Sequence, residues 1–480
     1  MAFNSKRIVA SLAAVAAMGM ALTGCGGDTA NGGSGGSDGD VIELTYLHRL
    51  PDSDGMVLVN DIVARWNEEH PNIHVTATKF DGSAADMIKK LETDVKADNA
   101  PDVAQIGYSE LPEVFIKGML EDVTEEAAKY EDHFAAGPFS LMQVDGKTYG
   151  LPQDTGPVVY FYNAAEFEKL GISVPETKEQ LIEYSKKAAE SGKYITLYQA
   201  DADLLSALAG ASGPWYTVED GKWVVNTETE GSKEVADTWQ QLLDANATST
   251  VARYDPAFDK SVQDGTLIGT VGAAWEAPLI MDSAGDTGVG DWRVAQLGDW
   301  FGNGDKTGPD GGSGVAVMKG CEHKAEAVEF LDWFNTQVAD LTSQGLVVAA
   351  TTEAAETPES WSEFYGGQDV MAEFATANAN MGEFTYMPGF STVNAAFKEA
   401  ADKAIDGEGT VADAFSVAQS AGQGIRASAD PGRLRSAETT SLFDRKMQLI
   451  GIGVGGASLR SLFRFRGGGN VASFRIAALS

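Results

Sequence analysis

The alternation of strand-like and helix-like segments after residue 41 is the feature that most constrains this fold. Residues Ile42 to Leu47 alternate polar and apolar side chains, as a half-buried strand does. The next segments predict, in order, a helix with apolar residues from Val57 to Trp66, a strand at 73–77, a helix at 84–95 and a strand at 102–106. This β-α-β order predicts a parallel sheet covered by helices, and hence an α/β fold.

Sheets of this kind bind ligands beyond the carboxyl ends of their strands, so the loops after the strands are candidate site loops. Arginine is scarce in the body of the chain, which makes an arginine directly after the first strand a candidate; its alternative role is a surface ion pair. The loops after Leu47, after Ile106 and near Pro152 supply the candidate ligand-binding residues His48, Arg49, Asp52, Tyr108, Ser109, Asp154 and Thr155.

The first 25 residues have the order of a bacterial secretion signal. Lys6 and Arg7 precede an almost wholly apolar run at 8–22, which is shorter than the roughly 20 residues of a membrane span. Leu22-Thr23-Gly24-Cys25 follows and resembles the lipobox of bacterial lipoproteins, in which the cysteine thiol carries the lipid. We therefore expect residues 1–25 to be a lipoprotein signal and Cys25 to be the lipidation site. The alternative is an ordinary signal peptide with an incidental cysteine.

Residues 26–40 (GGDTANGGSGGSDGD) offer almost nothing to bury and predict a flexible tether. By the square-root rule such a chain spans about 20 Å on average. The folded body is expected to begin near Val41. Together these features predict a protein on the extracellular face of the cytoplasmic membrane, attached through its lipid only.

The formal charge of −35, from 70 acidic and 35 basic side chains, excludes several partners. Nucleic acid and anionic lipid surfaces both attract basic patches, so we expect neither to bind this chain. If Cys25 is lipidated, Cys321 is left alone and no intramolecular disulfide is expected. His70 and His74 are four residues apart, but Pro71 prevents the helix that would align them on a metal. We expect no metal and no cofactor.

A series of short motifs then occurs in the order typical of one family. They are Trp66-Asn67, Pro71-Asn72-Ile73-His74-Val75, Pro101-Asp102-Val103, Gly118-Met119-Leu120-Glu121-Asp122, Gly146-Lys147-Thr148-Tyr149-Gly150-Leu151-Pro152, Tyr160-Phe161-Tyr162-Asn163, Gly171-Ile172-Ser173-Val174-Pro175-Glu176-Thr177 and Gly272-Ala273-Ala274-Trp275. Over residues 41–420 the chain thus resembles the extracellular solute-binding proteins of the maltodextrin-binding type, which serve sugar ABC importers.

The resemblance implies a two-lobe, periplasmic-binding-protein-like clamp hinged on crossing strands. The N-lobe is expected at 41–155 and 298–350 and the C-lobe at 156–297 and 351–420, and residues 290–295 resemble the second crossing strand. An oligosaccharide would close the lobes, and the permease subunits of the transporter would read the closed form. A monomer without enzymatic activity is expected.

A sugar has apolar C–H faces and a rim of hydroxyl groups, so aromatic rings and planar polar groups are expected to bind it. The resemblance implies a stacking tryptophan at Trp275, and the neighbouring carboxylate is placed to accept hydroxyl groups. Other tryptophans lie in glycine-containing loops, with a core position as their alternative. The further candidates are Glu276, Trp300, Trp215, Phe390 and Asn394.

Two other functions stay open from the sequence. A lipid-anchored carbohydrate-active enzyme would also be acidic and aromatic, although no motif for a catalytic carboxylate pair is present. A binding protein for a peptide, a polyamine or iron is the other.

Residues 421–480 depart from the resemblance, because they are rich in glycine and arginine and oppose the charge of the body. Our hypothesis is that this basic tail lies outside the ancestral fold. The alternative is a basic appendage that touches a membrane or a partner.

Overall fold

The computed structural model describes residues 41–428, except residues 54, 220–221 and 383. They belong to a compact unit that begins at Val41. The expected signal at 1–25 with Cys25, the expected tether at 26–40 and most of the basic tail, residues 429–480, lie outside the described residues.

The three strands predicted at the start of the body form the parallel part of a mixed sheet. β1 (Ile42–His48) pairs in parallel with β2 (Ile73–Lys79) on one side and with β3 (Val103–Gly107) on the other. α1 (Val59–Glu69) precedes β2, and α2 (Ala84–Lys96) follows it. Each helix buries one apolar face, and that of α1 consists of Val59, Ile62, Val63 and Trp66.

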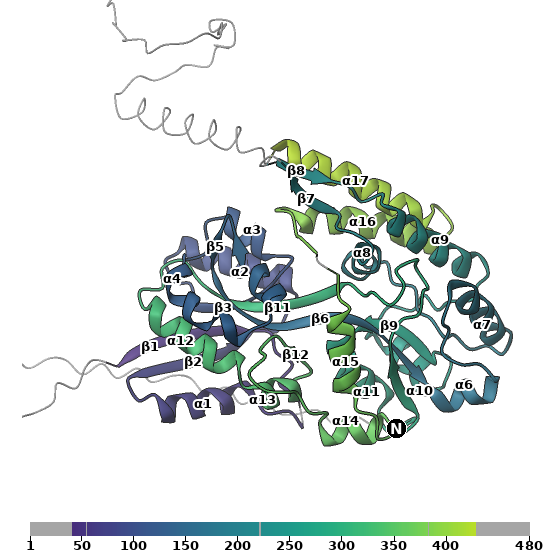
Figure 1. Cartoon of the computed structure of the whole chain (residues 1–480), viewed down its shortest axis with the longest axis horizontal. Coiled ribbons are helices and arrows are strands. Elements are labelled where there is room, and N and C mark those ends of the chain that lie inside the picture. The colour runs from purple at the N-terminus through teal and green to yellow at the C-terminus, as the bar shows by residue number, and fades with distance from the viewer. Residues whose placement is uncertain (1–40, 54, 220–221, 383, 429–480) are drawn as a thin grey trace, which may run out of the picture. The chain divides into compact units, whose positions relative to one another are not determined.

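One long strand, β6 (Gly150–Asn163), runs through both halves of the molecule (Figure 1). Its first half pairs antiparallel with β11 (Pro309–Val317), which also pairs with β3. Its second half pairs with β9 (Gly269–Ala273) and β10 (Trp292–Ala295). β6 and β11 therefore connect an N-lobe built on β1, β2 and β3 to a C-lobe built on β9 and β10.

The second crossing strand lies later in the chain than the sequence indicated. Residues 290–295, expected in that role, include β10, whose partners are residues 160–163 in the C-lobe half of β6. Residues 298–308 also pack on the C-lobe, because the Trp300 Nε1–H donates to the Pro175 carbonyl at 2.8 Å. The chain therefore returns to the N-lobe at β11 and not at residue 298.

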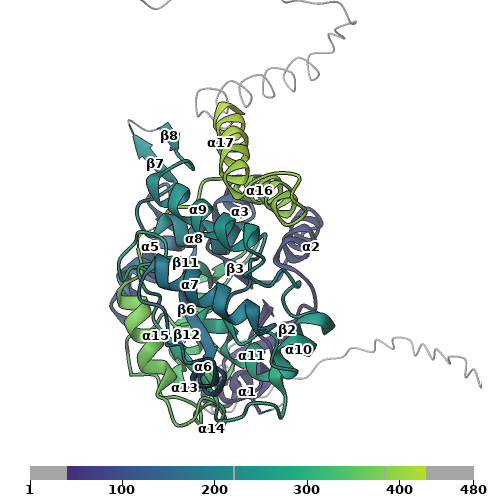
Figure 2. The ribbon, with the colours of Figure 1, turned by 90° about the vertical axis from the view of Figure 1, so that its right-hand side faces the viewer.

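The helices divide between the two lobes, as Figure 1 shows, and Figure 2 views the molecule from the C-lobe side. Besides α1 and α2, the N-lobe has α3 (Leu111–Ile116), α4 (Thr124–Ala127), η1 (Ala128–His133), α5 (Ala136–Leu141), β4 (Gln143–Val144), β5 (Lys147–Thr148), α12 (Lys324–Asn335), α13 (Val338–Ser343) and β12 (Val347–Val348). The C-lobe has α6 (Ala164–Leu170), α7 (Lys178–Glu190), α8 (Ala202–Gly210), β7 (Tyr216–Glu219), β8 (Lys222–Val225), α9 (Glu230–Asp244), α10 (Pro256–Gln263), η2 (Ala274–Glu276), α11 (Ala277–Ala284), α14 (Glu359–Phe364), α15 (Val370–Ala379), α16 (Phe390–Ile405) and α17 (Val411–Ser428).

Helix α17 continues past residue 420, where the family-like part was expected to end. A Cβ atom on Gly422 would touch Val225, and Ile425 packs against the hydrophobic core. The first residues of the expected tail are thus part of the C-lobe. Within the described part of the chain, no helix is long and apolar enough to cross a membrane.

Gly156 is one of the positions where the two crossing strands approach each other too closely for a side chain. A Cβ atom at this position would be 2.0 Å from the Asp310 carbonyl oxygen. We expect Gly156→Ala to lower the free energy of unfolding by about 1–3 kcal/mol, because backbone would have to move. Thermal unfolding tests this against Gly424→Ala, where the new Cβ would have no atom within 4 Å. Equal melting temperatures for the two variants would contradict the close approach.

Candidate ligand-binding site

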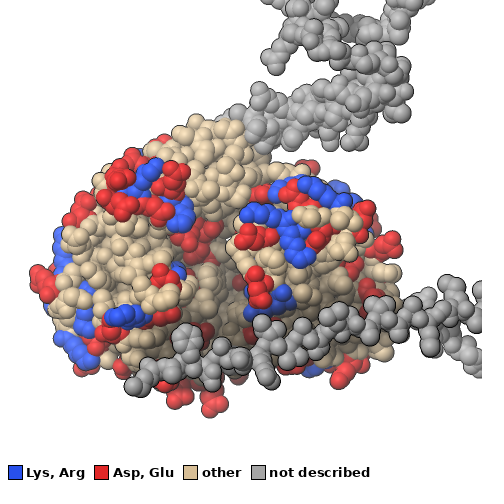
Figure 3. Space-filling view, turned by 180° about the vertical axis from the view of Figure 1, so that it is seen from behind, with Lys and Arg blue, Asp and Glu red and all other residues tan. Residues whose placement is uncertain are grey.

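A cavity of about 390 Å³ lies where the two lobes face each other. The loops after β1 and β3 form its N-lobe wall, the start of α8 and the η2–α11 segment form its C-lobe wall, and the crossing strands lie between. Figure 3 shows the groove between the lobes from behind, with acidic side chains in its depth. We call this space the acidic cavity. Its lining includes Arg49, Gln105, Ser109, Glu110, Asp154, Asp201, Asp203, Trp275, Leu279 and Asp310.

Trp275 supplies the aromatic surface of the acidic cavity. It lies in η2, directly after β9, and its side chain is only partly buried. The indole Nε1–H donates to the Asp310 carbonyl at 2.9 Å, which fixes the ring against β11. A ring held in this way can cover the apolar face of a sugar.

Glu276 follows Trp275 but is not available to a ligand. Its side chain is fully buried, and Arg253 Nη1 donates to both of its carboxylate oxygens at 2.7 Å. The Tyr254 hydroxyl and the Ala273 backbone N–H also donate to it. The expectation that Glu276 accepts sugar hydroxyls is therefore replaced by a structural role, which is to anchor the turn that carries Trp275.

Asp154 lies on the crossing strand β6 at the floor of the acidic cavity. Its Oδ1 accepts hydrogen bonds from the Ser313 backbone N–H at 2.8 Å and from the Ser313 hydroxyl at 2.6 Å. Burial nevertheless raises the pKa of Asp154 to about 6, with Arg49 acting in the opposite direction. Asp154 has a second carboxylate oxygen to which the structure assigns no partner among the described residues.

Asp203 on the C-lobe and Glu110 on the N-lobe face each other through the acidic cavity. Asn394 Nδ2 donates to Asp203 at 3.0 Å. Burial and the nearby carboxylates of Asp201 and Glu110 raise the pKa of Asp203 to about 7. Burial also raises the pKa of Glu110, while Arg49 opposes this shift. The carboxylate of Glu110 on the N-lobe thus helps to raise the pKa of Asp203 on the C-lobe.

The raised pKa of Asp203 predicts that the stability of the fold depends on pH. The folded chain holds the Asp203 proton more tightly than the unfolded chain does, between pH about 4 and pH about 7. The free energy of unfolding is therefore expected to fall as the pH rises through this window. In Asp203→Asn that slope should be reduced, as urea unfolding at a series of pH values would show. Asp406→Asn, which removes an exposed acid at the end of α16, is the matched control. An unchanged slope in Asp203→Asn would contradict the assignment.

A second cavity, of about 610 Å³, opens between the lobes on the other side of the crossing strands. It shares Gly311 with the acidic cavity. Because aromatic side chains from both lobes line it, we call it the aromatic cavity. They are Tyr108, Trp223, Phe384 and Tyr386. Together the two cavities offer a carboxylate-rich compartment and an aromatic one at the same lobe boundary.

Three predicted aromatic site residues belong instead to the hydrophobic core. Trp215 is buried and donates its Nε1–H to Ser232, and its ring packs against Phe415. Trp300 is buried with its ring against Tyr160. Phe390 is buried in an aromatic cluster of the C-lobe. We remove all three from the candidate site, because their rings are buried in the core, where they stabilise the fold and are not exposed to a ligand.

The other candidates divide into those that line a cavity and those that support one. Arg49, Ser109 and Asp154 line the acidic cavity with Trp275, and Tyr108 and Thr155 line the aromatic cavity. The remaining three support the walls. His48 is buried against Tyr46, Asp52 accepts from the Val59 N–H and from Gln344, and Asn394 positions Asp203.

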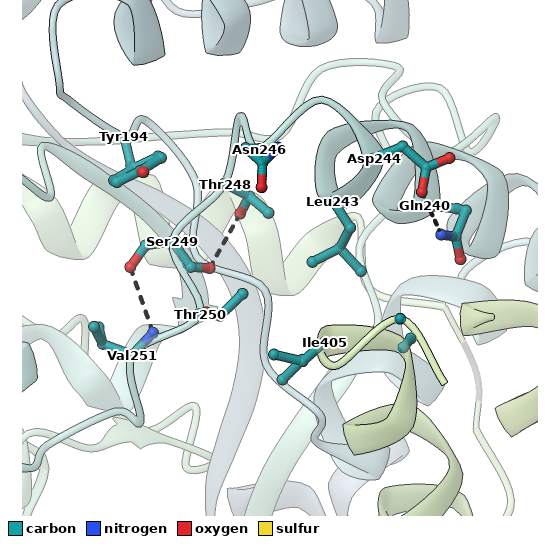
Figure 4. A pocket seen from close by; sticks show the side chains of 12 residues that line it. Tyr194, Gln240, Leu243, Asp244, Asn246, Thr248, Ser249, Thr250, Val251 and Ile405 are labelled. Carbon is teal, nitrogen blue, oxygen red and sulfur yellow. Dashed lines mark hydrogen bonds between the residues drawn. The ribbon is translucent and has the colours of Figure 1, made fainter. Parts of the chain in front are cut away.

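A third pocket, of about 420 Å³, lies wholly on the C-lobe (Figure 4). It is formed by the end of α9, the segment 246–251 and the end of α16. The hydrogen bonds drawn in Figure 4 join Gln240 to Asp244, Thr248 to Ser249 and Ser249 to Val251. No N-lobe residue lines this pocket, so a ligand bound in it would not contact both lobes. We therefore do not take it as the candidate site.

Sequence reasoning did not select several residues of the acidic cavity. These are Gln105, Glu110, Asp201, Asp203 and Asp310. In a chain with 70 acidic side chains, a carboxylate at a helix start carries no distinguishing pattern. The carboxyl-end rule did contain a signal for Glu110, which follows Ser109 in the loop after β3. Within the described residues, no group of three or more His, Cys, Asp or Glu side chains is arranged to hold a metal ion.

Two α/β lobes joined by crossing strands, with a ligand-sized cavity between them, define the class of two-lobed binding proteins. The family model of bacterial extracellular solute-binding proteins matches residues 61–365, which is more than half of the chain. The chain belongs to this family.

Comparison with known proteins adds three relatives. The galacto-N-biose-/lacto-N-biose I-binding protein of the ABC transporter from Bifidobacterium longum, solved with lacto-N-biose, is 66% identical, with a TM-score of 0.79 over 80% of this chain and 97% of that chain. A transporter-associated binding protein from B. animalis subsp. lactis, solved with β-1,6-galactobiose, is 27% identical, with a TM-score of 0.68 over 80% and 97%. The lactose-binding protein of Rhizobium radiobacter is 23% identical over 342 residues, 67% of this chain and 78% of that protein.

Proposed function

We propose that this chain is the sugar-binding component of a bacterial ABC importer, with a short oligosaccharide such as lacto-N-biose as its ligand. The observation that carries the proposal is the 66% identity to the Bifidobacterium longum binding protein over 80% of this chain. The cavities supply the chemistry that such a ligand needs. Trp275 offers an aromatic face, and Asp154, Asp203 and Glu110 offer acceptors for hydroxyl groups.

In the proposed mechanism the ligand binds between the open lobes and is enclosed when they close. β6 and β11 are the hinge, because they connect the lobes as paired strands. One cross-lobe contact is already formed, from the Ser391 hydroxyl at the start of α16 to Glu113 on α3, at 2.6 Å. The closed surface is the form that the permease subunits recognise.

We further propose that the protein acts as a monomer held at the extracellular face of the membrane. Support for the anchor comes from the sequence alone, in the apolar run at 8–22 and the Leu22-Thr23-Gly24-Cys25 motif. Metabolic labelling with a radioactive fatty acid tests it. Label is expected in the native chain and not in Cys25→Ala, and label in both would contradict Cys25 as the site.

Isothermal titration of the chain lacking residues 1–25 tests the ligand. This truncation leaves every described residue in place. Lacto-N-biose, galacto-N-biose, β-1,6-galactobiose and lactose form the panel, with product analysis of each mixture afterwards. One saturable site without product supports the proposal. Hydrolysis would favour the enzyme alternative, since Asp203 and Glu110 face one cavity as catalytic carboxylates would. No heat with any sugar would contradict sugar binding.

A further inference from the structure

The acidic cavity has an unusual balance of charge for a site between two lobes. Five carboxyl groups line it, and Arg49 is the single basic side chain in its lining. The five come from the N-lobe, from both crossing strands and from the C-lobe, so that every wall contributes. They are Glu110, Asp154, Asp201, Asp203 and Asp310.

These carboxyl groups are held by neutral partners. Asp154 accepts from Ser313, Asp203 accepts from Asn394, and Asp201 accepts from the Asp203 backbone N–H at 2.9 Å as the cap of α8. None of the five has a lysine or arginine nitrogen within 4.0 Å among the described residues. Arg49 itself has a buried Nε without a partner in this structure. The negative charge of the cavity is therefore not cancelled locally by ion pairs.

Burial makes this charge matter for a ligand. Asp154 and Asp310 are almost completely buried, and like charges repel more strongly in such surroundings than in bulk water. Burial, and after it the neighbouring acids Asp201, Glu276 and Asp203, raise the pKa of Asp310 well above its usual range, so the cavity already disfavours a further negative charge at this position. An anion entering the cavity would add to this unfavourable sum. A hydroxyl group would reduce it, because it can donate a hydrogen bond to a carboxylate oxygen.

The two lobes place carboxyl groups on opposite walls of the acidic cavity. Glu110 precedes α3 on the N-lobe and Asp203 lies in the first turn of α8 on the C-lobe. The Ser391–Glu113 hydrogen bond brings these same parts of the two lobes together. A ligand between Glu110 and Asp203 must therefore tolerate carboxylates on two sides.

We propose that the acidic cavity selects uncharged sugars over sugars that carry a carboxylate, sulfate or phosphate, and that Asp203 and Glu110 are specificity-determining residues for this discrimination. The inference rests on the proposed function and deepens it, because it defines the charge class of the ligand. Two geometric observations support it: the charged side chains that line the cavity are acidic except for Arg49, and the cavity lies across the boundary between the lobes.

The test compares two sugars of nearly equal size. One is the panel disaccharide that binds best, with its C6 hydroxymethyl group oxidised to a uronate, and the other is the corresponding neutral uronamide. The chain lacking residues 1–25 is titrated with each sugar at pH 7.5. The pair of sugars is prepared twice, once with the change on each of the two rings of the disaccharide. We expect the uronate to bind at least ten-fold more weakly than the uronamide. In Asp203→Asn and Glu110→Gln this ratio should shrink several-fold, and in the exposed-acid control Asp406→Asn it should stay unchanged.

The outcomes separate the two proposals. Binding of the parent disaccharide tests the proposed function, and the ratio of uronate to uronamide affinity tests the inference. Equal affinities for the two derivatives would overturn the inference even when the parent binds. Loss of both derivatives alike would also overturn it, since size and not charge would then decide. A ratio that shrinks as much in Asp406→Asn as in Asp203→Asn would remove the specificity role from Asp203 and Glu110.

Discussion

Arg253→Met is expected to lower the free energy of unfolding by about 3–5 kcal/mol, because it leaves a fully buried carboxylate without its partner. Arg253 Nη1 donates to both oxygens of Glu276, and Arg253 Nη2 donates to the Val271 carbonyl. The Arg253 side chain is 11% exposed and that of Glu276 is 0% exposed, so water cannot replace the lost bonds. Urea unfolding of the variant, monitored by circular dichroism, measures the change.

The double variant Arg253→Met with Glu276→Leu is the control. It removes both charges, and replacing a buried pair by apolar residues is far less costly than breaking it. We therefore expect the double variant to be more stable than Arg253→Met alone. A double variant that is less stable than either single variant would contradict the buried pair as the cause.

Trp275→Ala is expected to weaken sugar binding by about 2 kcal/mol, which is about 30-fold in the dissociation constant, as for other aromatic hot spots. The ring is the aromatic surface of the acidic cavity, and its contribution to the core is limited because it is partly exposed. Titration with the best-binding panel disaccharide measures the loss. Melting temperature, recorded on the same samples, is expected to change little.

Trp275→Phe is the matched control, since it retains a ring without the Nε1–H that donates to Asp310. It should keep most of the affinity if stacking dominates. Equal losses in Trp275→Phe and Trp275→Ala would assign the effect to the indole hydrogen bond. Unchanged affinity in Trp275→Ala would place the sugar elsewhere.

Much of the fold could be predicted from the sequence, because it follows from local patterns. The segments at 42–47, 73–77 and 102–106 are β1, β2 and β3, since alternation and strand-helix order are local properties of the chain. The second crossing strand was predicted wrongly. Residues 292–295 are extended as that role requires, but which strand they pair with is decided by contacts far along the chain, here with residues 160–163.

In the candidate site, too, features that follow from local sequence could be predicted, and features that depend on distant contacts could not. Arg49 and Ser109 could be found because the ends of neighbouring parallel strands meet at one edge of the sheet. Asp154 was expected in a loop near Pro152, but it lies within the antiparallel crossing strand β6. Glu276 could not be judged correctly, because its partner Arg253 is 23 residues away and is brought to it only by the fold. Glycines around Trp300 suggested an exposed loop, yet the ring is buried against Tyr160.

The decisive measurement is a crystal structure of the chain lacking residues 1–25, grown with the panel disaccharide that binds best. We predict sugar density in the acidic cavity, with one ring on the face of Trp275 and hydroxyl groups on Asp154 and Asp203. Sugar bound only in the C-lobe pocket of Figure 4, with the acidic cavity empty, would contradict the assignment of the site.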